Sequence, residues 1–517
     1  MAHTQYPFLV KHEFMQWAES WKAHKDSLPQ ALRWKGFFVN MVFAIAFLMT
    51  KARMNGPVRS QAFYNVATTK YLPFLTTWAN PVVKAQAYLI LALYALHMPS
   101  TENIIALSSW TIRYCVMAQL HLAETEPAPV SRDAQIQIQV RRRVFWCAYT
   151  LDRAVCSSYD FPCCVPDHHI TVANFANVDD DELFVVASSL APGSQMVGSS
   201  GVTNVSSALH IFAGRKIESE IQEVTLGKDF VPHSEESFRW RSTVLDKLKE
   251  WDRLSKASSD LSQKGYVSLP WLSMIYHYNL VTLYRPTTRA IVRGIAGDWS
   301  VQACSQALLL FRKFQMAREI AQPWLGLLTQ FQIGVTLLYC FWATPPQLWR
   351  DSYRSADVPD AVRACSSTLA IFAERWTEAE CLRDVFETLA REIPLGESWP
   401  RPKRMTPAGV ATVESSLPHT TQVVVHRPVL RMIREMATED FPVDDRPVMQ
   451  EMDLDDDNPP PSSAIPALAP GDDDGGGMGL QWAEHSFPGP DHNWNDMPAF
   501  LNDDFMSSYE PFHYKDI

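Results

Sequence analysis

The side chains best suited to chemistry gather in a short stretch after residue 160, where two cysteines and two histidines stand close together. Cys163 and Cys164 are followed by His168 and His169, and thiolates and imidazoles are common zinc ligands. Adjacent residues of an extended chain point to opposite sides, so at most two of these four side chains can converge. Zinc needs three or four ligands. The pattern therefore favours packed or partly exposed thiols, and we expect no metal and no cofactor.

A run of carboxylates follows at Asp179-Asp180-Asp181-Glu182. Such a run binds divalent metal in helical isoprenoid cyclases when it projects from a helix and faces a second metal-binding helix. Here the run lies in a predicted loop and no companion motif is present, so the sequence favours a solvated charge run.

Catalytic and nucleotide-binding signatures are absent from the sequence. There is no Gly-x-Ser-x-Gly, no phosphate-binding Gly-x-x-x-x-Gly-Lys and no Gly-x-Gly-x-x-Gly. We therefore predict that the chain is not an enzyme. The alternative is a helical enzyme or small-molecule-binding protein with an aromatic cavity. Trp271, Tyr276, Tyr278 and Tyr284 are most simply core, but they could wall an apolar pocket.

The helix that positions the cysteines and histidines is predicted just before them. Its apolar residues recur at three- and four-residue steps, on one stripe of a helix: Val140, Val144, Cys147, Ala148, Leu151 and Val155. Asp152 lies at the margin of this stripe, and a half-buried carboxylate needs a cationic partner. Arg141 is roughly 16 Å away along the helix, at about 1.5 Å per residue. We therefore expect the partner on another helix, with Arg113 and Arg285 as candidates. Pro162 ends the helix.

The segment from residue 141 to 172 resembles the middle homology region of fungal zinc-cluster transcription factors. That family commonly shows basic residues, Phe-Trp, Leu-Asp-Arg, Gly-Arg-Pro and a run ending in Ile-Asp-Val. The matching residues here are Arg141, Arg142, Arg143, Phe145, Trp146, Leu151, Asp152, Arg153, Pro162, Val165, Pro166, Asp167, Ile170 and Val172. Asp160-Phe161 replaces the Gly-Arg pair. Because a turn glycine usually supplies a positive φ that Asp tolerates only in part, the turn departs from the family pattern here.

The resemblance extends over most of residues 5–392. Its start is similar to Tyr6-Pro7-Phe8-Leu9, and a later motif is similar to Leu283-Tyr284-Arg285-Pro286. The segment from Ala364 to Leu369, with Arg375-Trp376, resembles the closing helices of the region. The structural motif residues implied by the resemblance are Arg142, Trp146, Asp152, Arg153 and Arg285.

The sequence predicts an all-α fold, an irregular multi-helix regulatory domain followed by a disordered acidic tail. Residues 1–175 form the first half of the helical region, 176–205 a loop and 206–392 the second half. Residues 393–436 are predicted as a proline-rich, basic linker with a short helix, and 437–517 as the tail. The longest apolar run, Phe37 to Met49, is thirteen residues long, short of the ~20 needed to span a membrane. It is predicted as a buried core helix, and no membrane partner is expected.

Charge is divided unevenly between body and tail. Residues 437–517 hold 19 Asp and Glu against Arg446 and Lys515, a balance of −17. Since the whole chain carries −11, residues 1–436 carry +6. The sequence has no Cys-x-x-Cys pair, whereas the DNA-binding module of the resembled family is built from six closely spaced cysteines. We therefore expect DNA contact only through a zinc cluster that was lost or left out of this sequence, or through a DNA-bound partner.

The end of the chain has the composition of an activation segment. Acidic residues there alternate with Trp494, Phe500, Leu501 and Phe505, so the charges keep these apolar side chains soluble and free to enter a partner's groove. The alternative is a solubilising tail without a partner. Transcription machinery is the partner expected for this segment.

The function expected from these features is nuclear transcription regulation. Arg401, Lys403 and Arg404 form the only basic cluster of the C-terminal region and are predicted as a nuclear import signal. The resemblance implies control through interdomain contacts, a homodimer or a small-molecule effector. By family analogy, the target is a metabolic or secondary-metabolite gene set, and activation is the expected effect.

Overall fold

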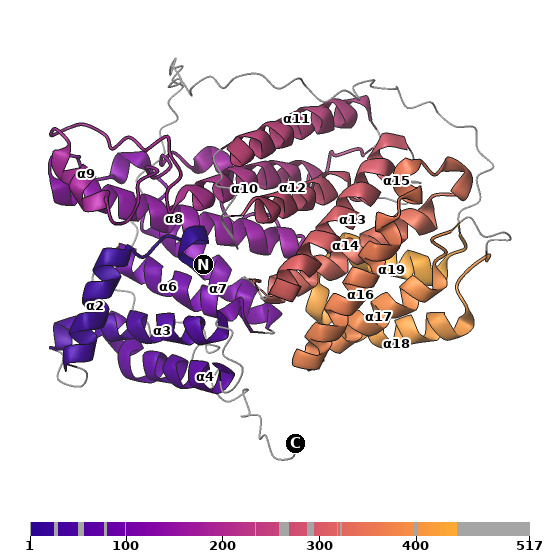
Figure 1. Cartoon of the computed structure of the whole chain (residues 1–517), viewed down its shortest axis with the longest axis horizontal. Helices are drawn as coiled ribbons and strands as arrows, with labels where there is room; N and C mark the ends of the chain where they lie inside the picture. Colours follow the sequence, from indigo (N-terminus) through magenta and orange to yellow (C-terminus); the bar gives the residue numbers. More distant parts are fainter. Residues whose placement is uncertain are drawn as a thin grey trace. The chain divides into compact units, whose positions relative to one another are not determined.

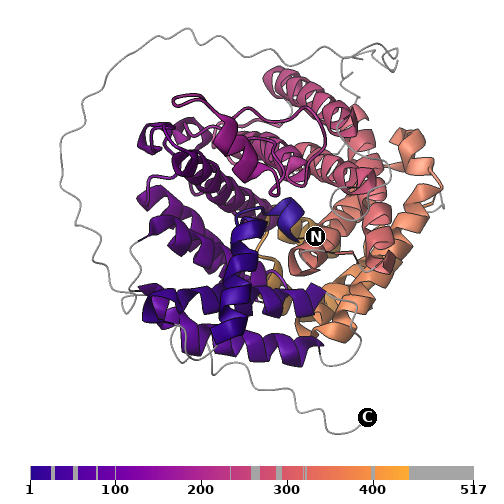
Figure 2. The ribbon, with the colours of Figure 1, turned by 60° about the vertical axis from the view of Figure 1, so that its left-hand side comes forward.

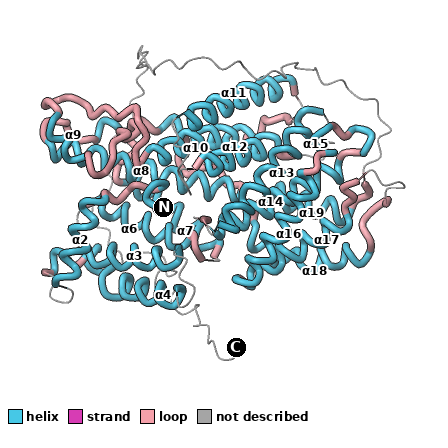
Figure 3. The backbone as a smooth tube through the Cα atoms, in the orientation of Figure 1, coloured by secondary structure: helices cyan, strands magenta, loops and turns pink. Residues whose placement is uncertain are grey.

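The structure is a computed structural model that describes residues 2–24, 29–49, 56–76, 80–98, 100–232, 234–257, 268–286, 294–317, 319–320, 323–396 and 402–441. Throughout these ranges the chain forms helices joined by loops and turns, without a strand (Figure 3). The predicted all-α class is therefore confirmed for the described part of the chain. The predicted tail anchors Trp494, Phe500, Leu501 and Phe505 lie outside the described residues.

The N-terminal helices pack against helices that lie near them in the sequence. Helix α3 (Trp34–Met49) packs against α4 (Gly56–Val66) and α6 (Pro81–Ala95), and α6 packs against α7 (Thr101–Met117). Helix α2 (Lys11–His24) crosses α3, as the rotated view shows (Figure 2). These helices pack together because each has a stripe of apolar side chains that a neighbouring helix must cover.

The apolar run predicted as a core helix forms most of α3. Phe37 and Phe38 are fully buried, whereas Phe43 is 40% exposed, so the run lines the core mainly with its first half. At the start of α3, a Cβ atom on Gly36 would lie 2.5 Å from the ring of Tyr71. Only a glycine allows this close approach.

Helix α8 (Arg132–Tyr159) is the longest helix among the described residues. The Ser131 hydroxyl caps its start by accepting a hydrogen bond from the backbone N–H of Ala134. The helix ends at Asp160, whose φ of 58° and ψ of 44° are left-handed. Packing partners lie on several sides of α8, including α6, α7 and α10 (Ser206–Thr225), so most of its side chains are buried.

The second half of the body surrounds α14 (Pro323–Ala343). The helices of this half are α11 (Glu235–Ala257), α12 (Leu269–Tyr284), α13 (Gly294–Ala317), α16 (Asp357–Arg375) and α17 (Glu380–Glu392), shown in magenta to orange in Figure 1. By length and composition α14 could cross a membrane, but 89% of its most apolar window is buried inside the protein. Contacts with α13, α16 and α17 account for this burial, so α14 is a core helix.

The predicted linker at 393–436 is wrong for most of its length. Residues 407–438 form α18 (Pro407–Val424) and α19 (Arg427–Thr438), which pack on α17 and α14 beside one another (Figure 1). Four apolar side chains of α19 are fully buried: Val429, Met432, Ile433 and Met436. The prediction followed the shift to Pro and Arg; the short helix that it included, near residues 422–437, corresponds to α19, whereas α18 was not predicted.

Two further boundaries need correction. The body reaches at least Phe441, which is 4% exposed, so the first residues assigned to the tail at 437 belong to the folded part. The predicted loop at 176–205 contains a short helix, α9 (Leu183–Ser189). Its buried Leu183 and Ala187 join a small apolar cluster with Val178.

Candidate functional site

Side chains of α8 hold the extended segment that follows it. We call Arg142, Arg143, Trp146, Tyr149 and Arg153 the α8 clamp. Four of them are spaced i, i+4, i+7 and i+11, which places them on one face of the helix. The segment from residue 161 to 178 has only one short helical turn, so most of its backbone carbonyls need donors from elsewhere.

The clamp supplies these donors in nearly reverse order along the chain. Arg153 donates to the carbonyl of Val165, Trp146 to Ala173 at 2.9 Å, Arg142 to Asn174 at 3.3 Å and Arg143 to Val178 at 3.2 Å. Later residues of the segment thus meet earlier residues of α8. The segment therefore runs back along the helix, and three of the motif residues, Arg142, Trp146 and Arg153, fasten it there.

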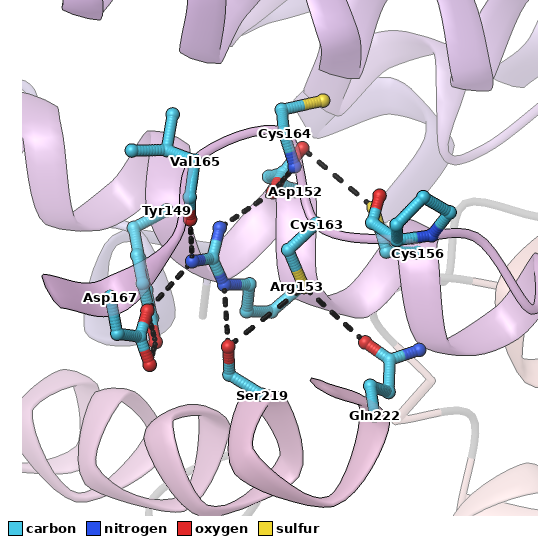
Figure 4. Close-up of polar contacts among 11 residues, drawn as sticks. Tyr149, Asp152, Arg153, Cys156, Cys163, Cys164, Val165, Asp167, Ser219 and Gln222 are labelled. Carbon is cyan, nitrogen blue, oxygen red and sulfur yellow. Dashed lines mark hydrogen bonds and ion pairs between the residues drawn. The ribbon is translucent and has the colours of Figure 1, made fainter. Parts of the chain in front are cut away.

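Arg153 lies at the centre of a buried polar junction (Figure 4). Its guanidinium is 2.7 Å from Asp152 Oδ2 and 2.7 Å from Asp167 Oδ1, and the Arg153 and Asp152 side chains are 0% and 1% exposed. It also donates to Ser219 Oγ on α10 at 3.2 Å and lies 4.0 Å from the centroid of the Tyr149 ring. The junction therefore joins α8, the extended segment and α10.

The predicted partner of Asp152 was wrong. The cation is Arg153, the next residue of the same helix, and not Arg113, which is exposed, or Arg285. Consecutive helical residues point about 100° apart, so the pair forms only because the long Arg153 side chain turns back toward Asp152. Burial would lower the pKa of Arg153, but Cys163, Tyr149 and the two carboxylates raise the pKa of the guanidinium above its ordinary value. Arg153 therefore remains charged.

A second buried ion pair joins Arg143 to Asp180, and it corrects the prediction of a solvated acidic run. The two side chains are 1% and 0% exposed. The backbone N–H of Lys11 also donates to Asp180 Oδ2 at 2.7 Å, which ties the N-terminal segment to the clamp. The flanking Asp181 and Glu182 are exposed as expected, and Asp181 is 69% exposed beside Lys11 Nζ. Sequence alone could not identify this pair because its members are 37 residues apart.

Asp160 takes the left-handed conformation of the glycine that the family pattern places there. Its side chain pairs with Arg427 of α19, with Nε and Oδ2 3.1 Å apart. Phe161, in place of the family arginine, stacks on Tyr159 with ring centroids 6.1 Å apart. The turn thus keeps its backbone shape while its side-chain contacts differ.

Arg285 lies apart from the α8 clamp. Its Nη1 donates to Nε2 of His426 at 2.6 Å, and both side chains are buried. Burial first, and then Arg285, holds the pKa of His426 well below its usual value. The imidazole is therefore neutral and able to accept this hydrogen bond, which links the end of α12 to the start of α19.

The side chains of the two cysteines and two histidines considered as metal ligands do not converge on one point. Cys163 and Cys164 point in different directions (Figure 4), and His168 and His169 are exposed. Cys163 instead meets Cys156 and Asp152, and the Sγ and carboxylate oxygen atoms of these three lie within 4.8 Å of one another. Cys156 was not predicted to belong to a site, although it follows Asp152 by one helical turn.

A cavity between α8, α12 and α14 bears on the enzyme or small-molecule alternative. Its volume is about 80 Å³, and Trp271, Tyr278 and Phe311 lie in its wall. Ligand pockets usually measure about 300 to 1,000 Å³. The acid in the wall, Glu218, is paired with Arg215, and the described wall residues include no histidine. The cavity therefore lacks the size and the convergent groups of a catalytic pocket.

The predicted import signal lies partly outside the described residues, since Arg401 is not described. Lys403 and Arg404 have exposed side chains, 3.3 Å and 3.6 Å from the carboxylate of Asp440. They are accessible at the surface, but they form a loose contact with the end of the body.

Fold and site together define a helical scaffold fastened by buried ion pairs, without a catalytic constellation in the described part. Residues 1–253 match the family described as the fungal specific transcription factor domain. This match confirms, as far as residue 253, the family resemblance predicted from the motifs. The family consists of transcription factors and not enzymes, which agrees with the prediction that the chain is not an enzyme.

Three curated proteins illustrate the relationship. Pyrimidine pathway regulatory protein 1 of Saccharomyces cerevisiae is 21% identical over 333 residues, which cover 62% of this chain and 36% of that protein. Protein STB5 of the same yeast is 26% identical over 329 residues, 59% of this chain and 40% of its own. The positive regulator of purine utilization of Emericella nidulans is 24% identical over 299 residues, 48% and 27% of the two chains. The chain thus spans less than half the length of these relatives. No solved structure gives a significant match.

Proposed function

We propose that this chain is a nuclear transcription regulator that activates a fungal metabolic or secondary-metabolite gene set. The observation that carries the proposal is the match of residues 1–253 to the fungal specific transcription factor domain. The names of two relatives, one a pyrimidine pathway regulator and one a purine utilization regulator, support a metabolic target. The exposed Lys403 and Arg404 are proposed to contribute to nuclear import.

The acidic tail is proposed as the part that recruits transcription machinery. Residues 442–517 follow the folded body and contain the segment in which Trp494, Phe500, Leu501 and Phe505 alternate with carboxylates. Such a segment suits binding as a short amphipathic helix, because the carboxylates keep the apolar anchors in solution until a groove accepts them.

The helical body is proposed as the regulatory part. Its buried ion pairs fix one arrangement of α8, α10 and the extended segment, which suits a domain that responds as a unit to a homodimer partner or a small effector. DNA contact is assigned to a zinc cluster outside this sequence or to a DNA-bound partner, since residues 1–436 carry only +6. The small cavity gives the enzyme or small-molecule alternative no support.

The test is a reporter assay with a heterologous DNA-binding domain fused to residues 442–517. We expect activation by this fusion and loss of activation when Trp494, Phe500 and Phe505 are all replaced by Ala. The matched control replaces Asn495, Asn502 and Ser507 by Ala in the same segment, and it should keep full activity. A fusion of the whole chain should be less active than the tail alone if the body regulates it.

Failure of the wild-type tail to activate would refute the activator assignment. Equal activity of the two triple variants would refute the role of the aromatic anchors and leave only the charge of the tail.

A further inference from the structure

The end of α8 and the loop after it bring two thiols together beside a fixed cation. Cys156 belongs to the last turn of α8, and Cys163 follows Pro162 in the loop. Their Sγ atoms lie within 4.8 Å of each other and of a carboxylate oxygen of Asp152. Because the loop carries no regular helix at Cys163, a small movement there can bring the two sulfur atoms to the ~2.05 Å of a disulfide.

The Cys163 sulfur both accepts a hydrogen bond from α10 and donates one to it. Ser219 Oγ donates to its Sγ at 3.9 Å and to no other sulfur of the cluster, and the same hydroxyl accepts from Arg153 Nε at 3.2 Å (Figure 4). The Cys163 side chain is partly exposed, whereas Cys156 is buried. Reactive cysteines are found in such partly exposed sites next to a cation.

The pKa values of the two thiols are shifted in opposite directions, as expected for an attacking cysteine and a resolving cysteine. A hydrogen bond from the Cys156 thiol, and to a lesser extent Arg153, lowers the pKa of Cys163, although burial opposes this shift. The same contact with Cys163 raises the pKa of Cys156, and a contact with Cys164 and then burial add to this shift. Elsewhere burial raises the pKa of Cys115 and of Cys340 to about 12, so those thiols are inert by comparison.

We propose that Cys163 and Cys156 form a peroxide-sensitive thiol pair, with Cys163 as the attacking thiolate and Cys156 as the resolving thiol. Cys163 Sγ attacks one oxygen of the peroxide and forms an S–O bond while the O–O bond breaks, giving a sulfenic acid and hydroxide, which takes up a proton as water. Cys156 Sγ then attacks the sulfenic sulfur, and a second water leaves as the disulfide forms. The peroxide is thereby reduced to two waters and the thiols are oxidised by two electrons.

The same atoms are less suited to a metal. Among the described residues the cluster offers three ligand atoms, and the Arg153 guanidinium, 2.7 Å from Asp152 Oδ2, opposes a further cation. Closing the disulfide would draw Cys163 away from Ser219 and from Gln222 Oε1, which accepts from Cys163 Sγ at 3.4 Å. Oxidation is therefore expected to loosen the loop from α10.

The test treats the reduced full chain with one equivalent of hydrogen peroxide, alkylates the remaining thiols and identifies linked peptides by mass spectrometry. Chymotrypsin cuts after Tyr159 and so separates Cys156 from Cys163. We expect the Cys156–Cys163 link before any other. Cys163→Ser should slow the loss of free thiol by at least about tenfold, because it removes the thiolate. Cys156→Ser should accumulate a sulfenic acid at Cys163 that a 1,3-dicarbonyl reagent traps.

Two controls make the result specific. Cys381→Ser removes another partly exposed thiol whose pKa is raised by burial, and it should leave the oxidation unchanged. Cys164→Ser should also still form the link, since Cys164 is not part of the three-residue cluster. Alkylation rates of the wild-type thiols, in which Cys163 should react fastest, provide a measurement that needs no variant.

Several results would overturn the proposal. They are oxidation of Cys163→Ser at the wild-type rate, a preferred link between Cys156 and Cys164, alkylation of Cys163 no faster than that of Cys381, and stoichiometric zinc retained by the purified chain and lost in Cys163→Ser.

Discussion

Asp152 and Arg153 are neighbours in the sequence and also ion-pair partners, with Arg153 Nη1 donating to Asp152 Oδ2 at 2.7 Å in a site where both side chains are almost completely buried. Adjacent positions of a helix do not normally face each other. The pair persists because Val165 and Asp167 of the extended segment hold the other side of the guanidinium. The ion pair therefore depends on the extended segment, which runs back along α8 and holds the Arg153 side chain in this position.

Replacing Asp152 by Leu should destabilise the protein by ~3–5 kcal/mol, the usual loss when one member of a buried pair is removed and the other stays charged. Urea unfolding of the full chain measures this. Asp167→Asn is the comparison, since Asp167 contacts the same guanidinium but is 37% exposed, and it should cost clearly less. A negligible loss for Asp152→Leu would mean that its carboxylate is solvated.

The Arg143–Asp180 pair allows a double-mutant cycle. Arg143→Met and Asp180→Leu should each cost ~3–5 kcal/mol, because each leaves a buried charge without its partner. The double variant should lose much less than the sum, since it leaves no charge behind. The measured quantity is the free energy of unfolding of the four proteins. Additive losses would show that the two side chains do not interact.

The packing of α19 can be tested with Met432→Ala. Met432 is fully buried, so the cavity left by the truncation should cost ~2–5 kcal/mol of stability. Arg434→Ala changes an exposed side chain of the same helix and should leave stability nearly unchanged. If both variants unfold like the wild type, α19 does not contribute its apolar face to the core.

His97 should make stability depend on pH. Burial first, and then Arg375, lowers the pKa of His97 from 6.5 to about 4. As the pH falls below 6.5, the unfolded chain therefore binds a proton that the folded protein does not bind, and stability is lost until the pH reaches about 4. The loss attributable to His97 is at most about 1.4 kcal/mol per pH unit.

Unfolding free energies of wild type and His97→Gln between pH 6.5 and 5 test this dependence, above the range in which most carboxylates titrate. The variant should show the shallower slope. The control is His168→Gln, a change at an exposed residue. Parallel slopes for wild type and His97→Gln would mean that the folded protein protonates His97 as readily as the unfolded chain.

Most helices could be located from the sequence because helical periodicity is a local property. The apolar pattern predicted a helix through Val140 to Val155 that ends at Pro162 and a core helix over Phe37 to Met49, and the structure has α8 at Arg132–Tyr159 and α3 at Trp34–Met49. The same reasoning missed α18, which has a proline inside it at Pro418. Where composition was used in place of periodicity, as over 407–424, the predicted linker was wrong, whereas the short helix predicted after it corresponds to α19.

The contacts of the site were harder to predict because they join residues that are distant in the chain. The motif residues Arg142, Trp146 and Arg153 were identified, but their acceptors are carbonyls of the following segment, and backbone carbonyls leave no signal in a sequence. The spacing of Asp152 and Cys156 by one helical turn was a usable signal for the cluster with Cys163.

Neighbouring residues were enough to locate most of the helices and the family motifs on them, because periodicity and motifs are local properties. The folded chain was needed to establish which carboxylate neutralises which arginine, that Asp180 is buried, and that Cys163 meets Cys156. The physical reason is that burial and ion pairing depend on the path of the chain between distant residues, and here that path is fixed by the return of the extended segment along α8.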